Sequence, residues 1–206
     1  MEVKQWIISE ARMNIGIYIY DEAEVLDFAG PFEVFSTANR FGQNHWQVAL
    51  IGETDKQVKG RGGFYVQPHY SIDNHPHLDL LLVVGGDHRD EVKKRNVINW
   101  IGKTAMQASS VASVCTGSFL LAEAGLLDGL LDGLQVTTHW EDIEDLKQRY
   151  PKLAVLSQRR WVDSGKYTTS GGISAGIDMS LYLVAKLKGE DLARQTAKQM
   201  EYQWNQ

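Results

Sequence analysis

The segment from residue 110 to residue 121 constrains the fold more than any other stretch of this 206-residue chain. Small and β-branched residues lead to Cys115, the only cysteine, and a helix-forming run follows through Leu120 and Leu121. This pattern predicts a buried strand, a sharp turn and a helix. A nucleophile at such a turn stands beside the unpaired amides of a helix N-terminus, which favour thiolate over thiol. The alternative is a buried, inert cysteine, although Gly117 and Ser118 are small enough to leave the sulfur accessible.

Strand and helix patterns alternate along the rest of the chain. Strands are predicted at 15–20, 46–51, 64–67, 79–84 and 135–138, with a hairpin formed by 160–162 and 166–169. Helices are predicted from about Pro31 and over 90–108, 140–150, 174–187 and 191–203. The continuous apolar run at 79–84 is typical of a central parallel strand buried on both faces. Because no linker interrupts the alternation, we predict one doubly wound α/β domain over 13–206, preceded by an extension at 1–12.

Composition argues against several classes of partner. The net charge is −5 and the pI is near 5.7, without a basic run, so nucleic acid and anionic membrane surfaces are disfavoured. No apolar stretch has the length of a membrane span, and residues 1–12 lack the apolar core of a signal peptide. One cysteine excludes an intrachain disulfide. We therefore expect a cytoplasmic protein that binds a small molecule and contacts neither membrane nor, directly, nucleic acid.

Residues that could take part in catalysis or binding follow several of the predicted strands. They are Asp27, Gly85, Gly86, Cys115 and Gly171. Ligands of doubly wound sheets bind beyond the carboxyl ends of the strands, so we expect these residues to converge. Two of them have simpler alternatives: Asp27 could be a helix N-cap, and the glycine pair could form a tight turn instead of presenting amides to an oxyanion.

Histidines give weaker indications. His139 follows a predicted strand and is either a triad-like partner of Cys115 or a structural residue. His69, His75 and His77 lie in loop sequence near Asp79 without a recognisable ligand geometry, so we expect solvated surface histidines and no metal site. The glycine-rich loop at 170–172 is too short for a nucleotide fingerprint, and no cofactor is expected.

Five segments resemble the ThiJ/PfpI superfamily of class I glutamine amidotransferase-like proteins, over essentially residues 13–203. They are Leu26–Val34, Val84–Gly86, Ser113–Ser118, Val136–Trp140 and Gly171–Asp178. The Cys-Thr-Gly-Ser turn, together with Asp27, is most similar to the isonitrile hydratase branch, and the same turn occurs in sensor domains fused to AraC-type activators. Peptidase-like members carry a histidine immediately after the cysteine, whereas this chain has Thr116.

The resemblance implies a flavodoxin-like three-layer sandwich, with a mostly parallel central sheet and a cysteine nucleophile elbow, that forms a homodimer. It further implies a hydro-lyase in which Cys115 attacks an isonitrile and Asp27 transfers protons, giving an N-substituted formamide. Thr116 and Gly86 would supply amides to the intermediate, and the remaining expected substrate-binding or supporting residues are Gly85, Gly171, Gly172, Ile173 and His139.

Two alternatives and two departures accompany this expectation. The chain could instead be a non-catalytic sensor domain of a transcription regulator, or a stress-related cysteine protein acting on reactive aldehydes. Val84 stands where the family usually has proline. A tandem Leu-Leu-Asp-Gly repeat at 126–133 lengthens the loop after the expected elbow helix, where it could alter the mouth of the site or a dimer contact.

Overall fold

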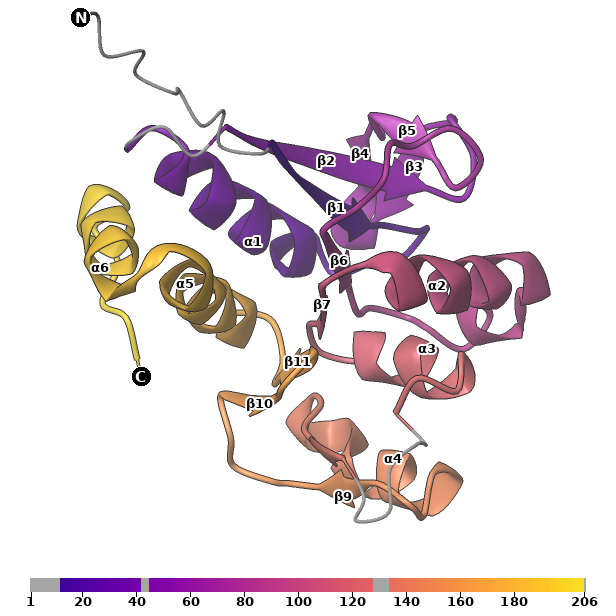
Figure 1. Ribbon diagram of the computed structural model, residues 1–206. Coiled ribbons are helices and arrows are strands. Elements are labelled where there is room, and N and C mark those ends of the chain that lie inside the picture. The colour runs from indigo at the N-terminus through magenta and orange to yellow at the C-terminus, as the bar shows by residue number, and fades with distance from the viewer. Residues whose placement is uncertain (1–11, 42–44, 128–133, 206) are drawn as a thin grey trace, which may run out of the picture.

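A seven-stranded sheet forms the centre of the computed structural model, which describes residues 12–41, 45–127 and 134–205 (Figure 1). Neighbouring strands are parallel except for the β10–β11 hairpin at one edge. The spatial order is β10 (Trp161–Ser164), β11 (Tyr167–Ser170), β7 (Ser110–Ser113), β6 (Leu80–Val83), β1 (Met13–Tyr18), β2 (Trp46–Gly52) and β5 (Tyr70–Ser71). The predicted parallel sheet, with the apolar strand near 79–84 at its centre, is confirmed.

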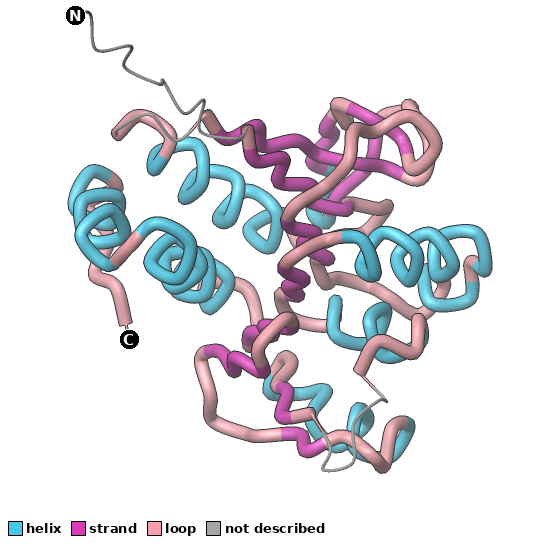
Figure 2. Tube along the Cα trace, in the orientation of Figure 1, coloured by secondary structure: helices cyan, strands magenta, loops and turns pink. Residues whose placement is uncertain are grey.

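Helices cover both faces of this sheet (Figure 2). On one face α1 (Val25–Ala38), α5 (Ala175–Lys188) and α6 (Glu190–Gln199) pack against one another, and on the other α2 (Arg95–Gln107) packs against α3 (Gly117–Glu123). At one end, α4 (Ile143–Arg149) accompanies a small pair of strands, β8 (Gln135–Val136) and β9 (Ala154–Val155). A hairpin of β3 (Val58–Gly60) and β4 (Phe64–Val66) lies at the other end. The arrangement is the expected flavodoxin-like sandwich of three layers.

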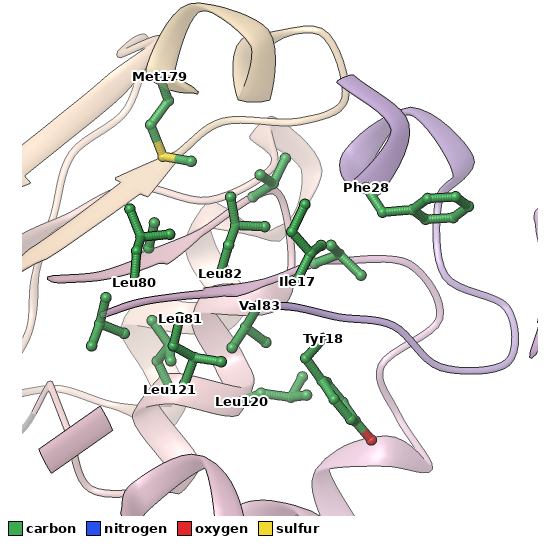
Figure 3. Packing of buried hydrophobic residues seen from close by; sticks show 14 of the residues in the cluster. Ile17, Tyr18, Phe28, Leu80, Leu81, Leu82, Val83, Leu120, Leu121 and Met179 are labelled. Carbon is green, nitrogen blue, oxygen red and sulfur yellow. The ribbon is translucent and has the colours of Figure 1, made fainter. Parts of the chain in front are cut away.

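The core lies on both sides of β6, whose four residues are fully buried (Figure 3). Leu80 and Leu82 point to the face that holds Met179 of α5, whereas Leu81 and Val83 point toward Leu120 and Leu121 of α3. Burial of each such side chain stabilises the fold by about 1.5–3 kcal/mol. The two-sided burial explains why this strand is a continuous apolar run instead of an alternating one.

Several element boundaries differ from those predicted. Helix α1 begins at Val25, six residues before Pro31, which lies inside the helix. Proline is common in the first helical turn, and this preference misplaced the predicted start. Strand β1 ends at Tyr18 instead of residue 20, and the helix predicted over 90–108 divides into a 3-10 turn, Glu91–Lys93 (η2), and α2. The last helix ends at Gln199, four residues earlier than predicted.

A buried carboxylate links the C-terminal segment to α5. Asp178 is fully buried and accepts a hydrogen bond from the Arg160 Nε at 2.8 Å and another from the backbone N–H of Asn205 at 3.0 Å. The Trp204 indole donates to the carbonyl oxygen of Asp178 at 3.2 Å. These contacts connect α5 with the residue that precedes β10 and with the C-terminal segment.

Two of the predicted features fall wholly or largely outside the described residues. The extension at 1–12 is described only at residue 12, and only Leu126 and Leu127 of the Leu-Leu-Asp-Gly repeat are described. Within the ranges that the structure covers, none of the helices combines the length and apolar character needed to cross a bilayer.

Candidate functional site

Cys115 occupies the sharp turn between β7 and α3, with its backbone in the left-handed region at a φ of 55°. Such a conformation costs a non-glycine residue about 1–3 kcal/mol and persists only where neighbours hold it. Here the Cys115 amide donates to the Gly171 carbonyl oxygen at 3.1 Å, and the Cys115 carbonyl accepts from the Thr138 hydroxyl at 2.9 Å. The residues that follow β11 and β8 therefore fix the position of the sulfur.

Two glycines allow this turn to approach the end of β6. A Cβ atom at Gly117 would lie 2.2 Å from the carbonyl oxygen of Val83. A Cβ atom at Gly85 would lie 2.5 Å from the amide nitrogen of Thr116 and 2.7 Å from the Cβ of Cys115. Both positions need glycine because real contacts of this kind are longer. Gly85 therefore has a steric role beside the cysteine beyond that of a tight turn.

Asp27 is the third residue of α1, and its side chain is fully buried. Glu24 occupies the N-cap position, so Asp27 is not the cap. Its Oδ2 accepts a hydrogen bond from the Gly85 amide at 3.0 Å, whereas Oδ1 has no hydrogen-bond partner among the described residues. Burial raises the pKa of Asp27 to about 8, with the Gly85 amide acting in the opposite direction. A pKa in this range favours the protonated carboxyl at neutral pH.

The Cys115 sulfur lies close enough to Asp27 for a charge on the carboxyl to act on it. Burial, and next the charge of Asp27, raise the pKa of Cys115 to about 12, while the backbone amides of Thr116 and Ile173 lower it. The amides were expected to favour thiolate over thiol, but burial instead leaves the thiol as the favoured form. The amides act in the expected direction, but the thiol is only 6% exposed and its desolvation outweighs them.

The Thr116 hydroxyl is bound to Gly86 on the opposite side of the turn. The Gly86 amide donates to Thr116 Oγ1 at 3.0 Å, and the same hydroxyl lies 3.0 Å from the Gly86 carbonyl oxygen. Gly86 has a φ of 141°, and a Cβ atom there would lie 2.3 Å from the Glu22 carbonyl oxygen. The Gly86 amide thus faces Thr116, and the amides that act on the sulfur are those of Thr116 and Ile173.

The glycine-rich loop after β11 contributes Ile173 to the cavity at Cys115, whereas Gly171 and Gly172 line a separate pocket. Ile173 has a φ of 51°, and its amide lies close enough to lower the pKa of both Asp27 and Cys115. Gly172 packs against the ring of His139, because a Cβ atom would lie 2.1 Å from the His139 Cδ2. His139 Nδ1 lies 3.4 Å from an Asp142 carboxylate oxygen. The structure thus places His139 in the wall of the site, with Nδ1 turned toward acidic residues of its own segment.

A cavity of about 230 Å³ opens above the sulfur. Its walls carry both signs of charge, with ion pairs between Arg61 and Glu24 at 3.4 Å and between Arg89 and Asp87 at 2.5 Å. Its lining residues are Glu24, Arg61, Gly86, Asp87, His88, Arg89, Cys115, Thr116, His139, Glu141, Asp142 and Ile173. The volume fits a small substrate whose reacting atom would meet Cys115, whereas the fully buried Asp27 is not one of the lining residues.

Sequence reasoning missed several residues of this cavity. Arg61 belongs to a glycine-rich segment, 60–63, whose pattern indicates only a turn, and Arg89 lies directly before the helix predicted over 90–108. His88 is buried against Phe119, with ring centroids 4.4 Å apart, and burial lowers its pKa, so it is a neutral imidazole. Because it stands two positions after the glycine pair, the sequence indicates that His88 could line the site, although it does not fix the direction of the side chain.

The histidines near Asp79 have structural contacts. His69 Nδ1 accepts from the Leu50 amide at 3.0 Å, and half-buried His75 accepts from the Trp100 indole at 2.7 Å. The expectation that His75 is solvated is therefore wrong. Among the residues that the structure covers, no cluster of three or more histidine, cysteine or acidic side chains is arranged to hold a metal ion.

Comparison with known proteins gives one family match and relatives of two kinds. The model of the DJ-1/PfpI family matches residues 13–186. An isonitrile hydratase from Pseudomonas putida is 33% identical over 192 residues, which are 92% of this chain and 78% of that protein. The HTH-type transcriptional regulator GbdR of Pseudomonas aeruginosa is 28% identical over 191 residues, so this chain spans about half (51%) of that relative. A solved ThiJ/PfpI family protein from Pseudomonas syringae, 22% identical, superposes with a TM-score of 0.83 over 100% of this chain and 83% of that protein.

Proposed function

Because the chain belongs to the DJ-1/PfpI family, we propose that it is a cysteine enzyme of the isonitrile hydratase type, with Cys115 and Asp27 as the catalytic pair. The observation that carries the proposal is the protonated, buried Asp27 next to a cysteine at the floor of a small cavity. Addition to an isonitrile needs both groups, since a nucleophile must attack the terminal carbon while an acid protonates that same carbon. The isonitrile hydratase of Pseudomonas putida supports this choice of reaction.

The hydrogen bonding of Asp27 indicates which of its two oxygens carries the proton. Oδ2 accepts the Gly85 amide, and a protonated oxygen is a poor acceptor, so the proton belongs on the unpartnered Oδ1. A pKa of about 8 lies close to neutral pH, where a group can both give and take a proton efficiently. Asp27 is therefore better suited to giving and taking a proton than to carrying a fixed negative charge.

The first step joins the sulfur to the isonitrile. A bond forms between Cys115 Sγ and the terminal carbon, the thiol proton passes to Asp27, and the carboxyl proton of Asp27 passes to the carbon. The product is a thioimidate, R–N=CH–S–Cys115, and Asp27 is again protonated. The Thr116 and Ile173 amides favour the sulfur in its charged form while the proton leaves.

The second step releases the product with water. Water adds to the carbon of the thioimidate, Asp27 assists the proton transfers, and the carbon–sulfur bond breaks to return the thiol. The nitrogen gains one hydrogen and the carbon gains the oxygen, so the product is the formamide R–NH–CHO. The volume of the cavity, about 230 Å³, limits the size of R.

A turnover assay with a small alkyl isonitrile tests the proposal. Formamide is quantified by NMR for the wild type, Cys115→Ala, Asp27→Asn and, as a surface control, Asp90→Asn, whose carboxylate contacts the Lys93 ammonium at 2.8 Å. We expect no turnover for Cys115→Ala, a loss of at least about 100-fold for Asp27→Asn and wild-type rates for the control. Hydration by Cys115→Ala at the wild-type rate would refute the mechanism.

The half-length match to GbdR favours a sensor domain as the second candidate. A sensor would bind a small molecule in the same cavity without turnover. Thermal shifts with isonitriles and small amides, in the absence of product, would support that function. Turnover of glyoxal instead would favour the aldehyde-handling alternative.

A further inference from the structure

Several buried polar side-chain atoms of the described residues lack a hydrogen-bond partner, and some of them belong to residues at or near the site. Within the described ranges, four buried side-chain polar atoms have no hydrogen-bond partner. One is the Asp27 Oδ1 discussed above, and a second belongs to Ser113, two residues before Cys115. A third is the Tyr20 hydroxyl, and the fourth, the Trp46 indole nitrogen, is in β2. Leaving a buried polar atom unpaired costs stability, so each such atom needs an explanation.

Tyr20 lies between β1 and α1 and is 2% exposed. The groups that face its hydroxyl come from three elements: Glu91 of η2, Asp27 of α1, and Cys115 with Thr116 at the start of α3. Burial raises the pKa of Tyr20 well above its ordinary value, and the three ionisable neighbours, all acids, raise it further, whereas the Thr116 side chain lies close enough to lower it. The hydroxyl is thus a neutral donor surrounded by groups that carry negative charge when ionised.

Tyr18 provides an internal comparison. It is two residues earlier, its ring centroid is 6.2 Å from that of Tyr20, and it is equally buried. Its hydroxyl donates to Glu91 Oε1 at 2.5 Å, and Lys94 pairs with the same carboxylate at 3.0 Å. Tyr18 and Lys94 therefore supply the partners of the Glu91 carboxylate. The Tyr20 hydroxyl remains able to interact with Asp27, Cys115 or Thr116.

We propose that Tyr20 is a positioning residue whose hydroxyl, unpartnered in the resting site, turns toward the negative charge that develops on the Asp27–Cys115 pair. The hydroxyl acts through this pair and Thr116, which are among the groups that act on it. The molecule accepts an unpaired buried hydroxyl in the resting state because the partner is created during the reaction. The expected change in turnover rests on the proposed function. The expected effect of Tyr20 on the Cys115 thiol does not depend on the substrate.

Tyr20→Phe, compared with Tyr18→Phe, tests this inference. Each substitution removes one oxygen from a fully buried ring. We measure the rate of Cys115 alkylation by iodoacetamide from pH 7 to 10, kcat and KM for an alkyl isonitrile, and the thermal midpoint. In Tyr20→Phe the thiolate loses a stabilising donor, so we expect alkylation about tenfold slower at each pH, which corresponds to a rise of about one unit in the thiol pKa. We also expect kcat to fall by a similar factor with KM nearly unchanged.

The thermal midpoint separates this role from a structural one. Tyr20→Phe removes an unpaired buried oxygen, so its midpoint should equal or exceed that of the wild type. Tyr18→Phe breaks a hydrogen bond to Glu91, so its midpoint should fall by about 3–6 °C while its alkylation rate stays within about twofold of the wild type. Wild-type alkylation rates in Tyr20→Phe, or equal slowing in both variants, would overturn the inference. If the wild type hydrates no isonitrile, the proposed function fails, while the alkylation rates still decide the role of Tyr20.

Discussion

Replacing Asp27 with asparagine should stabilise the fold while it abolishes proton transfer. An aspartic acid whose pKa is 3.8 when unfolded and about 8 when folded binds its proton more tightly in the native state. The unfolded chain loses this proton as the pH rises above 4, whereas the folded chain keeps it until about pH 8. Native stability therefore declines across that window, because ionisation favours the unfolded state.

The magnitude follows from the same two values. Each pKa unit corresponds to about 1.4 kcal/mol, so the rise from 3.8 to about 8 costs at most about 6 kcal/mol of unfolding free energy above pH 8. Asparagine has nearly the same shape and no charge, which removes this cost. Its buried amide also needs partners, so we expect a net gain of a few kcal/mol, smallest near pH 4 and largest above pH 8.

Urea unfolding at pH 4.5, 6, 7.5 and 8.5 measures the effect, with Asp178→Asn as the matched control. Both aspartates are fully buried, but Asp178 is paired with Arg160 and the Asn205 amide. Asp178→Asn should therefore destabilise the protein by about 1–3 kcal/mol, since it leaves those donors without a charged acceptor. If Asp27→Asn were destabilised by the same amount at every pH, Asp27 would be ionised in the native state and the reasoning would be refuted.

Three further substitutions probe the walls of the site. Gly85→Ala places a methyl group 2.5 Å from the Thr116 amide nitrogen, so we expect a loss of about 1–3 kcal/mol in urea unfolding and at least tenfold in kcat. Gly172→Ala displaces the His139 ring and should change KM for bulky isonitriles more than kcat; unchanged KM across a substrate series would contradict this. Thr116→Val removes the acceptor of the Gly86 amide and should cost about 1–2 kcal/mol, whereas Thr116→Ser should restore most of that stability.

The architecture was predictable because its signals are local or periodic. A four-residue strand buried on both faces leaves a continuous apolar run, and the strand–turn–helix around Cys115 is visible as a change from small, β-branched residues to helix formers. The start of α1 was not predictable from Pro31, because packing on α5 and the sheet tolerates proline inside that helix.

The convergence of Asp27, Gly85 and Cys115 was also predictable, since parallel strands end at one edge of the sheet. The shifted pKa values of Asp27 and Cys115 were not predictable, because they depend on burial that only the assembled fold determines. The role of Tyr20 was not predictable either, because its hydroxyl is notable only for lacking a hydrogen-bond partner among the described residues and no sequence motif marks it. Arg61 and Arg89 reach the cavity from loops whose direction is set by distant segments.

The two hydrogen bonds that hold the Cys115 backbone come from residues much later in the chain. The amide is held by Gly171 and the carbonyl by Thr138, residues that follow the cysteine by 56 and 23 positions. A cleavage between α3 and β8 would leave nucleophile and acid on one fragment and both anchors on the other. Recovery of thiol chemistry on mixing two such halves would then report their reassembly, which makes this chain a natural candidate for a split reporter.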